Sequence, residues 1–386
     1  MKKKIINYGS QYIDDHDIQN VVSCLKSNFI TQGPFVKKFE RGLKKYFKSK
    51  YAVSLSNGTA ALYLAIKSLK LKKSTCILTT PITFISSASS ILMNNHLIDF
   101  VDIDRTNLNI DPNLLEHKLK KNSKIKAVVA VDFAGNPCDW EALNYLKKKY
   151  EIFIINDNCH SMGSEYLNDK GYAAKYADIV TQSYHAVKTI TTGEGGAILT
   201  NNKKIYNFIN DQKTHGMIKN RQNKIGLWHY YVKNYGYNFR LSDIQCALGI
   251  SQLQKINEFV LKRRILAKNY FNLLSKYDDL IKLPNLTDKK IKQSFHLYPI
   301  QINFKKLKIK KKTFFENMLY KEKIRLQVHY IPLYKQPFLK IKNGHKIFQN
   351  SENYFRDAVS LPIFYQLKVS EQKKIINSML SELKII

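Results

Sequence analysis

Apolar runs of strand length alternate with helix-like segments from about residue 50 onward. The predicted strands span 51–55, 76–80, 97–102, 126–132, 152–156, 179–183 and 196–200, and the predicted helices span 59–69, 84–94 and 140–149. Continuous apolar strands separated by helices are typical of a mostly parallel sheet that helices cover on both faces. The pattern predicts an α/β fold, in which ligands bind at the carboxyl ends of the strands.

The pattern changes after residue 241. A long helical segment from 242 to about 274 opens with Leu241-Ser242-Asp243, a sequence typical of a helix start. Predicted strands at 296–303 and 324–329 follow, with a predicted closing helix at 371–383. We therefore expect a large domain over residues 1–245, and a linking helix with a smaller α+β domain over residues 246–386.

The composition is typical of a soluble globular protein, with 44% hydrophobic and 24% charged residues in a chain of 386. The longest apolar runs are of strand length, which is too short to cross a bilayer. The lysines at 2–4 are not followed by an apolar stretch long enough for a signal peptide. We expect a cytoplasmic protein that does not bind membranes.

The five cysteines are scattered and form no Cys-x-x-Cys pair, so the sequence predicts neither a disulfide framework nor a metal site. The formal net charge of +33 favours anionic ligands. However, only eight of the 63 basic residues are Arg, the residue that nucleic-acid sites favour, and the lysines are spread along the chain. We expect no nucleic-acid binding, and only a general attraction for an anionic sugar nucleotide.

Two residues suggest the chemistry of pyridoxal phosphate (PLP). Asp157 follows the predicted strand 152–156, and Lys188 follows the predicted strand 179–183. A PLP enzyme needs a Lys amine to bind the aldehyde and an Asp carboxylate to keep the pyridine nitrogen protonated. Each residue alone is ordinary, since most lysines here are surface residues and an Asp after a strand is commonly a turn or a cap. The interpretation of the pair as a PLP site depends on the residues around it.

Gly58 and Thr59 lie between a predicted strand and a predicted helix. Glycine permits a tight turn there, so that N–H groups at the helix start and the Thr59 hydroxyl face an anion. Ser183 would add a second hydroxyl to the same phosphate. The alternative is an ordinary strand–helix turn with Thr as the cap.

Other residues would complete such a site. Phe84 opens a helix at the same edge of the sheet and could stack on a flat ring, although a core Phe is the more common case. His160 could bind the cofactor's phenolic oxygen, although a lone His is more often structural. Asn238 and Arg240 precede the long helix and could bind phosphate or merely cap it.

Six segments occur in an order that carries a resemblance: SNGTAAL, PITF, DNCHSMG, SYHAVKTITTGEGGA, GYNFRLSDIQCALG and VHYIPLY. From residue 7 to about 363 the chain resembles the DegT/StrS-type sugar aminotransferases, a fold-type I PLP family. The resemblance implies that Lys188 forms the Schiff base, that Asp157 binds the pyridine nitrogen and that His160 lies beside the phenolic oxygen. It further implies that Phe84 stacks on the ring and that the phosphate contacts come from Gly58, Thr59 and Ser183.

The resemblance also covers the substrate end of the site. In this family the loop that holds Asn238 reaches the cofactor of the other subunit, which implies a homodimer with shared active sites. His329 and Tyr330 match a segment that faces the sugar nucleotide, and we group His185 with them. The sequence departs from the family at Asn156, where an acidic residue is common, at Asn158-Cys159, which replace small residues, and at Ala186, where Pro is frequent.

Within the family, the segments INYGSQYIDDHDI, VDFAGN and VHYIPLY look like the branch that serves pseudaminic acid biosynthesis. That branch transfers the amino group of L-glutamate to a UDP-4-keto-6-deoxy-N-acetylhexosamine. A 4-aminotransferase of a legionaminic acid, bacillosamine or perosamine route is an alternative, as is a non-catalytic regulator with the same fold. A PLP sugar dehydratase is disfavoured, because those enzymes carry His where Lys188 stands.

Overall fold

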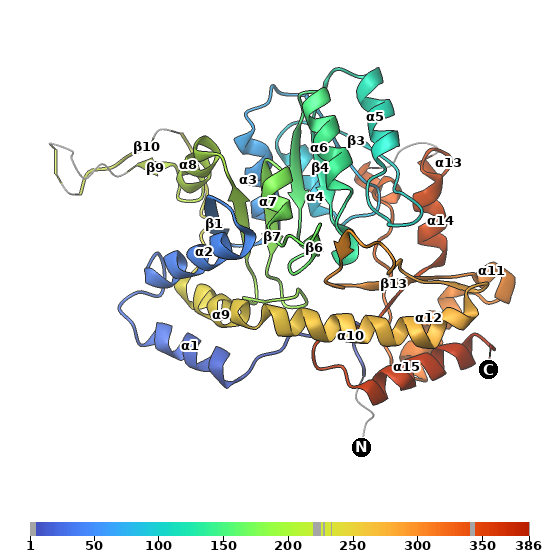
Figure 1. The fold of residues 1–386 in the computed structure, drawn as a ribbon. Helices are drawn as coiled ribbons and strands as arrows, with labels where there is room; N and C mark the ends of the chain where they lie inside the picture. The colour runs from blue at the N-terminus through green and yellow to red at the C-terminus, as the bar shows by residue number, and fades with distance from the viewer. Residues whose placement is uncertain (1–4, 219–224, 227, 233, 340–343, 386) are drawn as a thin grey trace.

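The computed structural model describes residues 5–218, 225–226, 228–232, 234–339 and 344–385. A seven-stranded sheet lies at the centre of this part of the chain (Figure 1). Its strands, in spatial order, are β1 (Tyr51–Leu55), β8 (Gly196–Thr200), β7 (Ile179–Ser183), β5 (Phe153–Asp157), β4 (Ile125–Val131), β2 (Cys76–Thr79) and β3 (Leu97–Phe100). β8 runs antiparallel to both neighbours, and the other pairs are parallel. The predicted mostly parallel sheet is confirmed.

Helices cover the sheet on both faces (Figure 1). Alternate residues of β4 join different hydrophobic clusters, since Val128 and Ala130 belong to one cluster and Ala127 and Val129 to another. Side chains of a strand point alternately to opposite faces, so both faces of this strand are buried and its sequence is a continuous apolar run. The helices around this sheet are α1 (Asp15–Leu25), α2 (Pro34–Phe47), α3 (Gly58–Ser68), α4 (Ser86–Met93), α5 (Pro112–Lys121), η1 (Phe133–Gly135), α6 (Trp140–Lys149), α7 (Tyr172–Tyr176) and α8 (Lys203–Gln212).

The segment predicted as one long helix is two helices, α9 (Asp243–Gln254) and α10 (Ile256–Leu274). Ser242 caps α9 with a capping box, as the sequence predicts. α10 connects the two halves of the molecule, because Val260 packs in a core cluster of the large sheet and Leu266 in the core of the C-terminal half. The division into domains at residue 245 remains a prediction.

The C-terminal half contains a three-stranded antiparallel sheet of β11 (Ile281–Lys282), β13 (Tyr298–Ile302) and β14 (Ala358–Leu361). Its helices are η2 (Ser275–Tyr277), α11 (Phe304–Leu307), α12 (Lys311–Tyr320), η3 (Leu333–Lys335), η4 (Pro337–Leu339), α13 (Gly344–Ile347), α14 (Gln349–Asp357) and α15 (Val369–Glu382). The prediction of a strand over 324–329 is wrong. This segment makes only isolated bridges, from Ile324 to Ile6 and from Gln327 to Ser360, because its two bridging residues pair with different segments and no continuous ladder forms.

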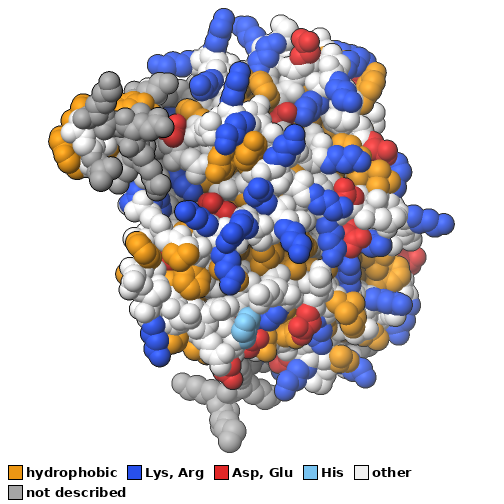
Figure 2. Space-filling view, turned by 60° about the vertical axis from the view of Figure 1, so that its left-hand side comes forward, with side chains coloured by type: hydrophobic (Ala, Val, Ile, Leu, Met, Phe, Trp, Pro, Cys, Tyr) orange, Lys and Arg blue, Asp and Glu red, His pale blue; other side chains and the backbone are white. Residues whose placement is uncertain are grey.

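Two short ribbons complete the structure. β6 (Glu165–Tyr166) pairs with β12 (Ile291–Lys292), and β9 (Met217–Ile218) pairs with β10 (Tyr231–Val232). The β9–β10 ribbon extends away from the body of the molecule (Figure 1). Among the described residues, no helix combines the length and the apolar character needed to cross a membrane. On the face drawn in Figure 2, Lys and Arg side chains are spread among other side chains and form no continuous stripe.

Candidate active site

A cavity of about 730 Å³ opens at the carboxyl ends of the central strands. Asp157 reaches it from the last position of β5, Ser183 from the last position of β7 and Gly58 from the first turn of α3. His329 and Tyr330 close it from the C-terminal half. The parallel topology thus gathers the predicted residues at one edge of the sheet, as expected for this fold class.

Lys188 lies just beyond β7, in a turn where its N–H donates to the carbonyl of His185 at 2.9 Å. Its side chain is half-buried and lines the cavity. Burial lowers the pKa of the amine, and the nearby Cys159 and Asp157 oppose this shift without cancelling it. A lowered pKa enlarges the fraction of neutral amine, which is the form that attacks a carbonyl carbon.

The Asp157 carboxylate is 6% exposed and is held from two sides. Its Oδ2 accepts a hydrogen bond of 2.8 Å from the Ser87 hydroxyl, and its Oδ1 accepts one of 3.3 Å from the Cys159 N–H. Ser87 Oγ lies 2.9 Å from Thr83 Oγ1, on the neighbouring turn. A carboxylate fixed in this way can pair with a protonated ring nitrogen that enters the cavity.

The first turn of α3 approaches the ends of β7 and β8 closely, because both contact points are glycines. A Cβ on Gly58 would lie 2.9 Å from the Ser183 Cβ, and a Cβ on Gly196 would lie 2.4 Å from the Asn57 carbonyl oxygen. The helix start and the Ser183 hydroxyl therefore face the cavity together. Such a helix start favours an anion of phosphate size.

Thr59 lines the cavity but does not cap α3. Asn57 is the cap, because its Oδ1 accepts a hydrogen bond of 2.8 Å from the Ala60 N–H. The Thr59 hydroxyl instead lies 2.8 Å from Ser86 Oγ. The alternative of a plain Thr cap is therefore wrong, and the two hydroxyls add polar groups to the anion end of the cavity.

His160 and His329 contribute neutral imidazoles. His160 Nδ1 accepts a hydrogen bond of 3.3 Å from the Ala134 N–H, and its Nε2 lies 3.2 Å from the Tyr330 hydroxyl. Burial, with a further contribution from the charge of Lys188, lowers the pKa of His160 well below its usual range. The same two causes lower the pKa of His329 to about 3. Both rings are therefore uncharged at neutral pH.

Phe84 and His185 line the cavity with exposed side chains. Phe84 is 55% exposed, and its ring centroid lies 6.0 Å from that of Tyr330. A large exposed aromatic face beside a cavity is suited to cover a flat ring. His185 lies at the cavity mouth, with its Nε2 4.0 Å from a carboxylate oxygen of Glu194.

Asn238 and Arg240 are the two predicted residues that the structure does not bring into this cavity. Asn238 is exposed and forms an isolated bridge with Thr214, and Arg240 is half-buried just beyond it. Within the described chain they therefore lie apart from the Lys188–Asp157 pair.

The structure also adds residues that the sequence did not indicate. Ser87 had a usable signal, because Thr83 and Ser87 stand four residues apart at the start of a Ser-rich helix beside the Asp157 strand. Tyr8, His296 and Gln327 line the cavity as well. They come from segments whose positions depend on long-range packing, and no local pattern marks them.

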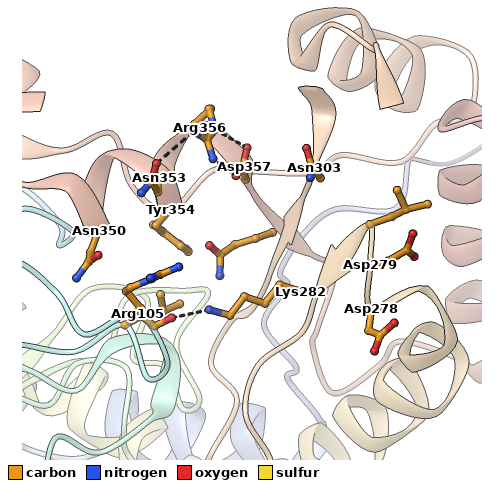
Figure 3. Close-up of a pocket in the computed structure, with 13 residues that line it drawn as sticks. Arg105, Asp278, Asp279, Lys282, Asn303, Asn350, Asn353, Tyr354, Arg356 and Asp357 are labelled. Carbon is orange, nitrogen blue, oxygen red and sulfur yellow. Dashed lines mark hydrogen bonds and ion pairs between the residues drawn. The ribbon is translucent and has the colours of Figure 1, made fainter. Parts of the chain in front are cut away.

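A second pocket of about 320 Å³ lies between the loop after β3 and the C-terminal half (Figure 3). Some of its polar groups bind one another. Arg356 pairs with Asp357 at 2.7 Å, and Lys282 Nζ donates to the carbonyl of Arg105 at 2.7 Å. None of the predicted site residues is among the residues that line it, so the cavity at the strand ends is the candidate site.

The sheet and the cavity together define an aminotransferase of fold-type I. Residues 11–380 match the model of the DegT/DnrJ/EryC1/StrS aminotransferase family, and the chain belongs to this family. The predicted fold class and the predicted class of enzyme are confirmed.

Individual relatives agree with this assignment. Over 383 residues the chain is 37% identical to the UDP-4-amino-4,6-dideoxy-N-acetyl-beta-L-altrosamine transaminase of Campylobacter jejuni subsp. jejuni serotype O:23/36 (strain 81-176), with 98% of each chain covered. Helicobacter pylori PseC, an aminotransferase involved in the biosynthesis of pseudoaminic acid, matches with a TM-score of 0.90 at 31% identity, over 99% of this chain and 100% of that chain. The PMP-form of the putative sugar aminotransferase Spr1654 from Streptococcus pneumoniae matches with a TM-score of 0.89 at 25% identity. The match covers 98% of this chain and 99% of that chain.

Proposed function

We propose that this protein transfers the amino group of L-glutamate to the 4-keto group of a UDP-4-keto-6-deoxy-N-acetylhexosamine, with PLP as cofactor. The observation that carries the proposal is the cavity that combines Lys188 and Asp157 with an anion-binding helix start. The near full-length identity with the altrosamine transaminase supports a particular substrate, UDP-2-acetamido-2,6-dideoxy-β-L-arabino-hexos-4-ulose, and a place in pseudaminic acid biosynthesis.

The residues of the cavity fit PLP, which supplies an electron sink for the carbon next to the transferred nitrogen. We assign the aldehyde carbon to Lys188 and the ring nitrogen to Asp157. We assign the phosphate to the start of α3, because the absence of a side chain at Gly58 lets this helix approach Ser183 closely, so that the helix start and the Ser183 hydroxyl line the same end of the cavity. We assign the remaining contacts of the cofactor to Thr59, Phe84 and His160.

Lys188 is also our candidate for the proton carrier. Burial lowers the pKa of this amine and so enlarges its neutral fraction, the form in which Nζ can take the α-proton of L-glutamate. In the second half of the reaction the same atom delivers a proton to C4 of the sugar. The overall change converts L-glutamate and the keto sugar into 2-oxoglutarate and the amino sugar.

We further propose a homodimer with shared active sites. Asn238 and Arg240 lie outside the cavity of their own chain, which leaves them available to the cavity of a second copy. The nearby β9–β10 ribbon extends from the body (Figure 1), and Trp228 and Tyr235 are each 75% exposed there. Large exposed aromatic side chains are typical of protein interfaces. We also propose that the enzyme acts in the cytoplasm. We assign His185, His329 and Tyr330 to the binding of the sugar nucleotide.

Absorbance spectroscopy tests the proposal. The purified protein with PLP should show the absorption band of the lysine-bound cofactor, and Lys188→Ala should lack it. L-glutamate should bleach the band, and the 4-keto sugar of the L-arabino series should restore it. Recovery with only the D-xylo series would move the enzyme to a legionaminic acid or bacillosamine type of route. A band that never forms, or never responds to L-glutamate, would favour the regulator.

A further inference from the structure

A lysine on α3 contacts the segment that carries Asn238. The Lys67 Nζ donates hydrogen bonds to the Tyr63 hydroxyl at 3.3 Å and to the Tyr237 hydroxyl at 3.1 Å. The same nitrogen lies 5.0 Å from the centroid of the Tyr235 ring, a distance typical of a cation–π contact. We call these three tyrosines the tyrosine cage. Because Tyr63 belongs to α3 and the other two belong to the segment before α9, the cage joins that segment to the helix.

Lys67 carries a charge that the tyrosine cage stabilises. The residue is half-buried, and in the described part of the chain its amine is bound by phenol oxygens and not by a carboxylate. Burial would lower the pKa of this amine, but the hydrogen bonds with Tyr237 and Tyr63 outweigh the burial and raise the pKa above its ordinary value. The amine is therefore charged at neutral pH. Because the charge attracts both the hydroxyls and the ring faces, it ties Tyr235 and Tyr237 to α3.

The side chains of the Asn238 segment alternate between two sides. Asn238 forms an antiparallel bridge with Thr214, so the chain is extended there. The rings of Tyr237 and Phe239 stack with centroids 4.8 Å and planes 6° apart, which places both on one side. Both rings stand at nearly right angles to the ring of Tyr63 on α3. Asn238 lies between them in sequence and is exposed, so its side chain is on the side that faces away from α3.

Lys67 could act on either of two cavities. Through α3 it could affect the cavity of its own chain, because the start of this helix lines that cavity. However, the helix start is held independently of Lys67, since Asn57 caps it and Gly58 lies close to Ser183. The tyrosine cage, by contrast, directly joins α3 to the segment of Asn238. The contacts therefore favour an effect of Lys67 on Asn238.

We propose that Lys67 is a positioning residue for the active site of the second copy, because it holds Asn238 in the orientation that reaches that site. The inference rests on the proposed function and on its shared active sites. Lys67 does not line the cavity of its own chain, and it acts only through the tyrosine cage. Loss of its ammonium group should loosen the Asn238 segment and leave the cavity of the same chain intact.

Amide hydrogen exchange of the cofactor-free protein tests the hold on this segment. The Tyr237 N–H donates to the Gln212 carbonyl at 2.7 Å, and the Phe239 N–H donates to the Lys213 carbonyl at 3.1 Å. Lys67→Met should speed the exchange of both amides by roughly fivefold or more, because the segment opens more often without the cage. Unchanged exchange in Lys67→Met would overturn the inference.

Lys203→Met is the matched control for this measurement. The Lys203 Nζ also lies over two tyrosine rings, at 5.1 Å from the centroid of Tyr51 and 4.8 Å from that of Tyr206. Neither ring belongs to the Asn238 segment. Lys203→Met should therefore leave the exchange of that segment and the turnover rate unchanged, and an equal effect of both variants would contradict a specific role for Lys67.

Mixed dimers decide which cavity Lys67 serves. Lys67→Met alone should lower the turnover rate by roughly tenfold, because Asn238 is displaced and not removed. When these chains exchange subunits with Lys188→Ala chains, half of the dimers should contain one cavity with Lys188 from one copy and an intact Lys67 in the other. The mixture should then reach about a quarter of the wild-type rate by random pairing, above the rate of Lys67→Met alone. If Lys67 served its own chain, the mixture would instead fall to about half the rate of Lys67→Met alone.

Two further variants show whether the charge in the tyrosine cage matters. Lys67→Arg keeps a cation that can donate to both hydroxyls and stack on the rings, so it should retain most of the wild-type rate. Tyr237→Phe keeps the ring and removes one oxygen from the cage, so it should act as Lys67→Met does, with a smaller loss. A loss in Lys67→Arg as large as in Lys67→Met would contradict the inference.

The same exchange experiment separates this inference from the proposed function. If the mixture of Asn238→Ala and Lys188→Ala chains recovers activity and the mixture with Lys67→Met does not, the role of Lys67 is wrong and the shared sites stand. If neither mixture recovers, with subunit exchange verified, the shared sites are wrong and the inference fails with them. A wild-type protein that never reacts with L-glutamate would remove the proposed function and this inference together.

Discussion

Two of the pockets of this molecule, the cavity at the strand ends and the pocket of Figure 3, both contain lysine and aspartate side chains and use them differently. In the pocket of Figure 3, two cations bind acceptors of the protein, since Arg356 pairs with Asp357 at 2.7 Å and Lys282 Nζ donates to the Arg105 carbonyl at 2.7 Å. In the cavity at the strand ends, no ion pair is found for Lys188 among the described residues, and burial lowers the pKa of its amine. In the pocket of Figure 3 these two cations bind acceptors of the protein, and in the cavity at the strand ends the Lys188 amine is left for a ligand.

The comparison teaches that polarity alone does not define a site. The Lys188 cavity keeps an amine partly desolvated and a carboxylate fixed beside it, an arrangement whose benefit comes only with a bound partner. The pocket of Figure 3 gains nothing comparable, because its charges sit near the surface, where ion pairs contribute little. Variants in the two pockets should therefore have very different consequences.

The largest difference is expected between two lysine variants. Lys188→Ala should lower the turnover rate by more than about 10⁴-fold, because it removes both the covalent attachment and the proton carrier. Lys282→Ala, the matched control in the second pocket, should keep the rate within about twofold, because exposed charges away from a site contribute little. The test is to measure the turnover rates of the two purified variants by steady-state kinetics, after checking that their thermal stabilities are equal. Comparable losses of turnover rate in Lys188→Ala and Lys282→Ala would contradict the distinction between the two pockets.

The next effect concerns Asp157, the carboxylate that we assign to the ring nitrogen of the cofactor. Asp157→Asn keeps the shape but not the charge, and should cost about 10³- to 10⁴-fold in turnover, as for a carboxylate that holds another catalytic ring. Ser87→Ala removes one hydrogen bond to Asp157 and should cost about fivefold, in line with roughly 1 kcal/mol for one hydrogen bond. A Ser87 variant that lost more than the Asp157 variant would be inconsistent with this order.

Mixed dimers test whether the cavity needs residues from a second copy. Asn238→Ala alone should lower activity by roughly 10- to 100-fold, as expected when one contact residue of a site is lost. If the sites are shared, Lys188→Ala and Asn238→Ala chains that exchange subunits should form dimers with one intact site, and the mixture should recover about a quarter of the wild-type activity by random pairing. No recovery, with exchange verified by mass spectrometry, would place Asn238 in the site of its own chain.

Acid should destabilise the cavity through its buried histidines. His329 has a pKa of about 3 in the folded protein, below its unfolded value. Between these values the unfolded chain binds the extra proton, so stability falls as the pH drops from about 6.5 toward 3, by about 2–3 kcal/mol at pH 4.5 for this one residue. Denaturant unfolding at pH 7 and 4.5 should find a smaller acid loss for His329→Gln than for the wild type. Equal losses would mean that His329 is not held neutral.

The smallest effect is expected from the ion pair of the second pocket. Arg356→Ala breaks the exposed contact with Asp357 and should lower the free energy of unfolding by less than about 1 kcal/mol. The kcat/KM should stay within about twofold, because this charge touches no group of the Lys188 cavity. A large loss of activity in this variant would show that the second pocket communicates with the first.

The sequence predicted the residues that regular elements position. Asp157 and Ser183 end strands whose apolar runs fix their boundaries, and β7 and β8 have the predicted limits. The prediction failed where segments outside helices and strands position the residues of the cavity. His329 and Tyr330 reach the cavity as predicted, but single bridges from Ile324 and Gln327 hold their segment in place of a strand. Those bridges join residues far apart in sequence, so no local pattern could reveal them.

Two other features, a helix break and the position of Tyr8, could not be predicted from local sequence patterns for the same reason. The predicted long helix is interrupted at Lys255, whose amine binds Asp14 at 2.7 Å and the buried Asp17 at 2.6 Å. Tyr8 reaches the cavity because Ile6 pairs with Ile324 across the molecule. Both depend on the docking of the N-terminal segment, which tertiary packing decides.

The most direct test of the account is to trap the cofactor on the chain. The protein would be loaded with PLP, reduced with borohydride, digested and examined by mass spectrometry for the lysine that carries the pyridoxyl group. The account predicts a single adduct on Lys188, which L-glutamate added before reduction should prevent. With 63 basic residues in the chain, a stoichiometric adduct on any other lysine would contradict the assignment of the active site.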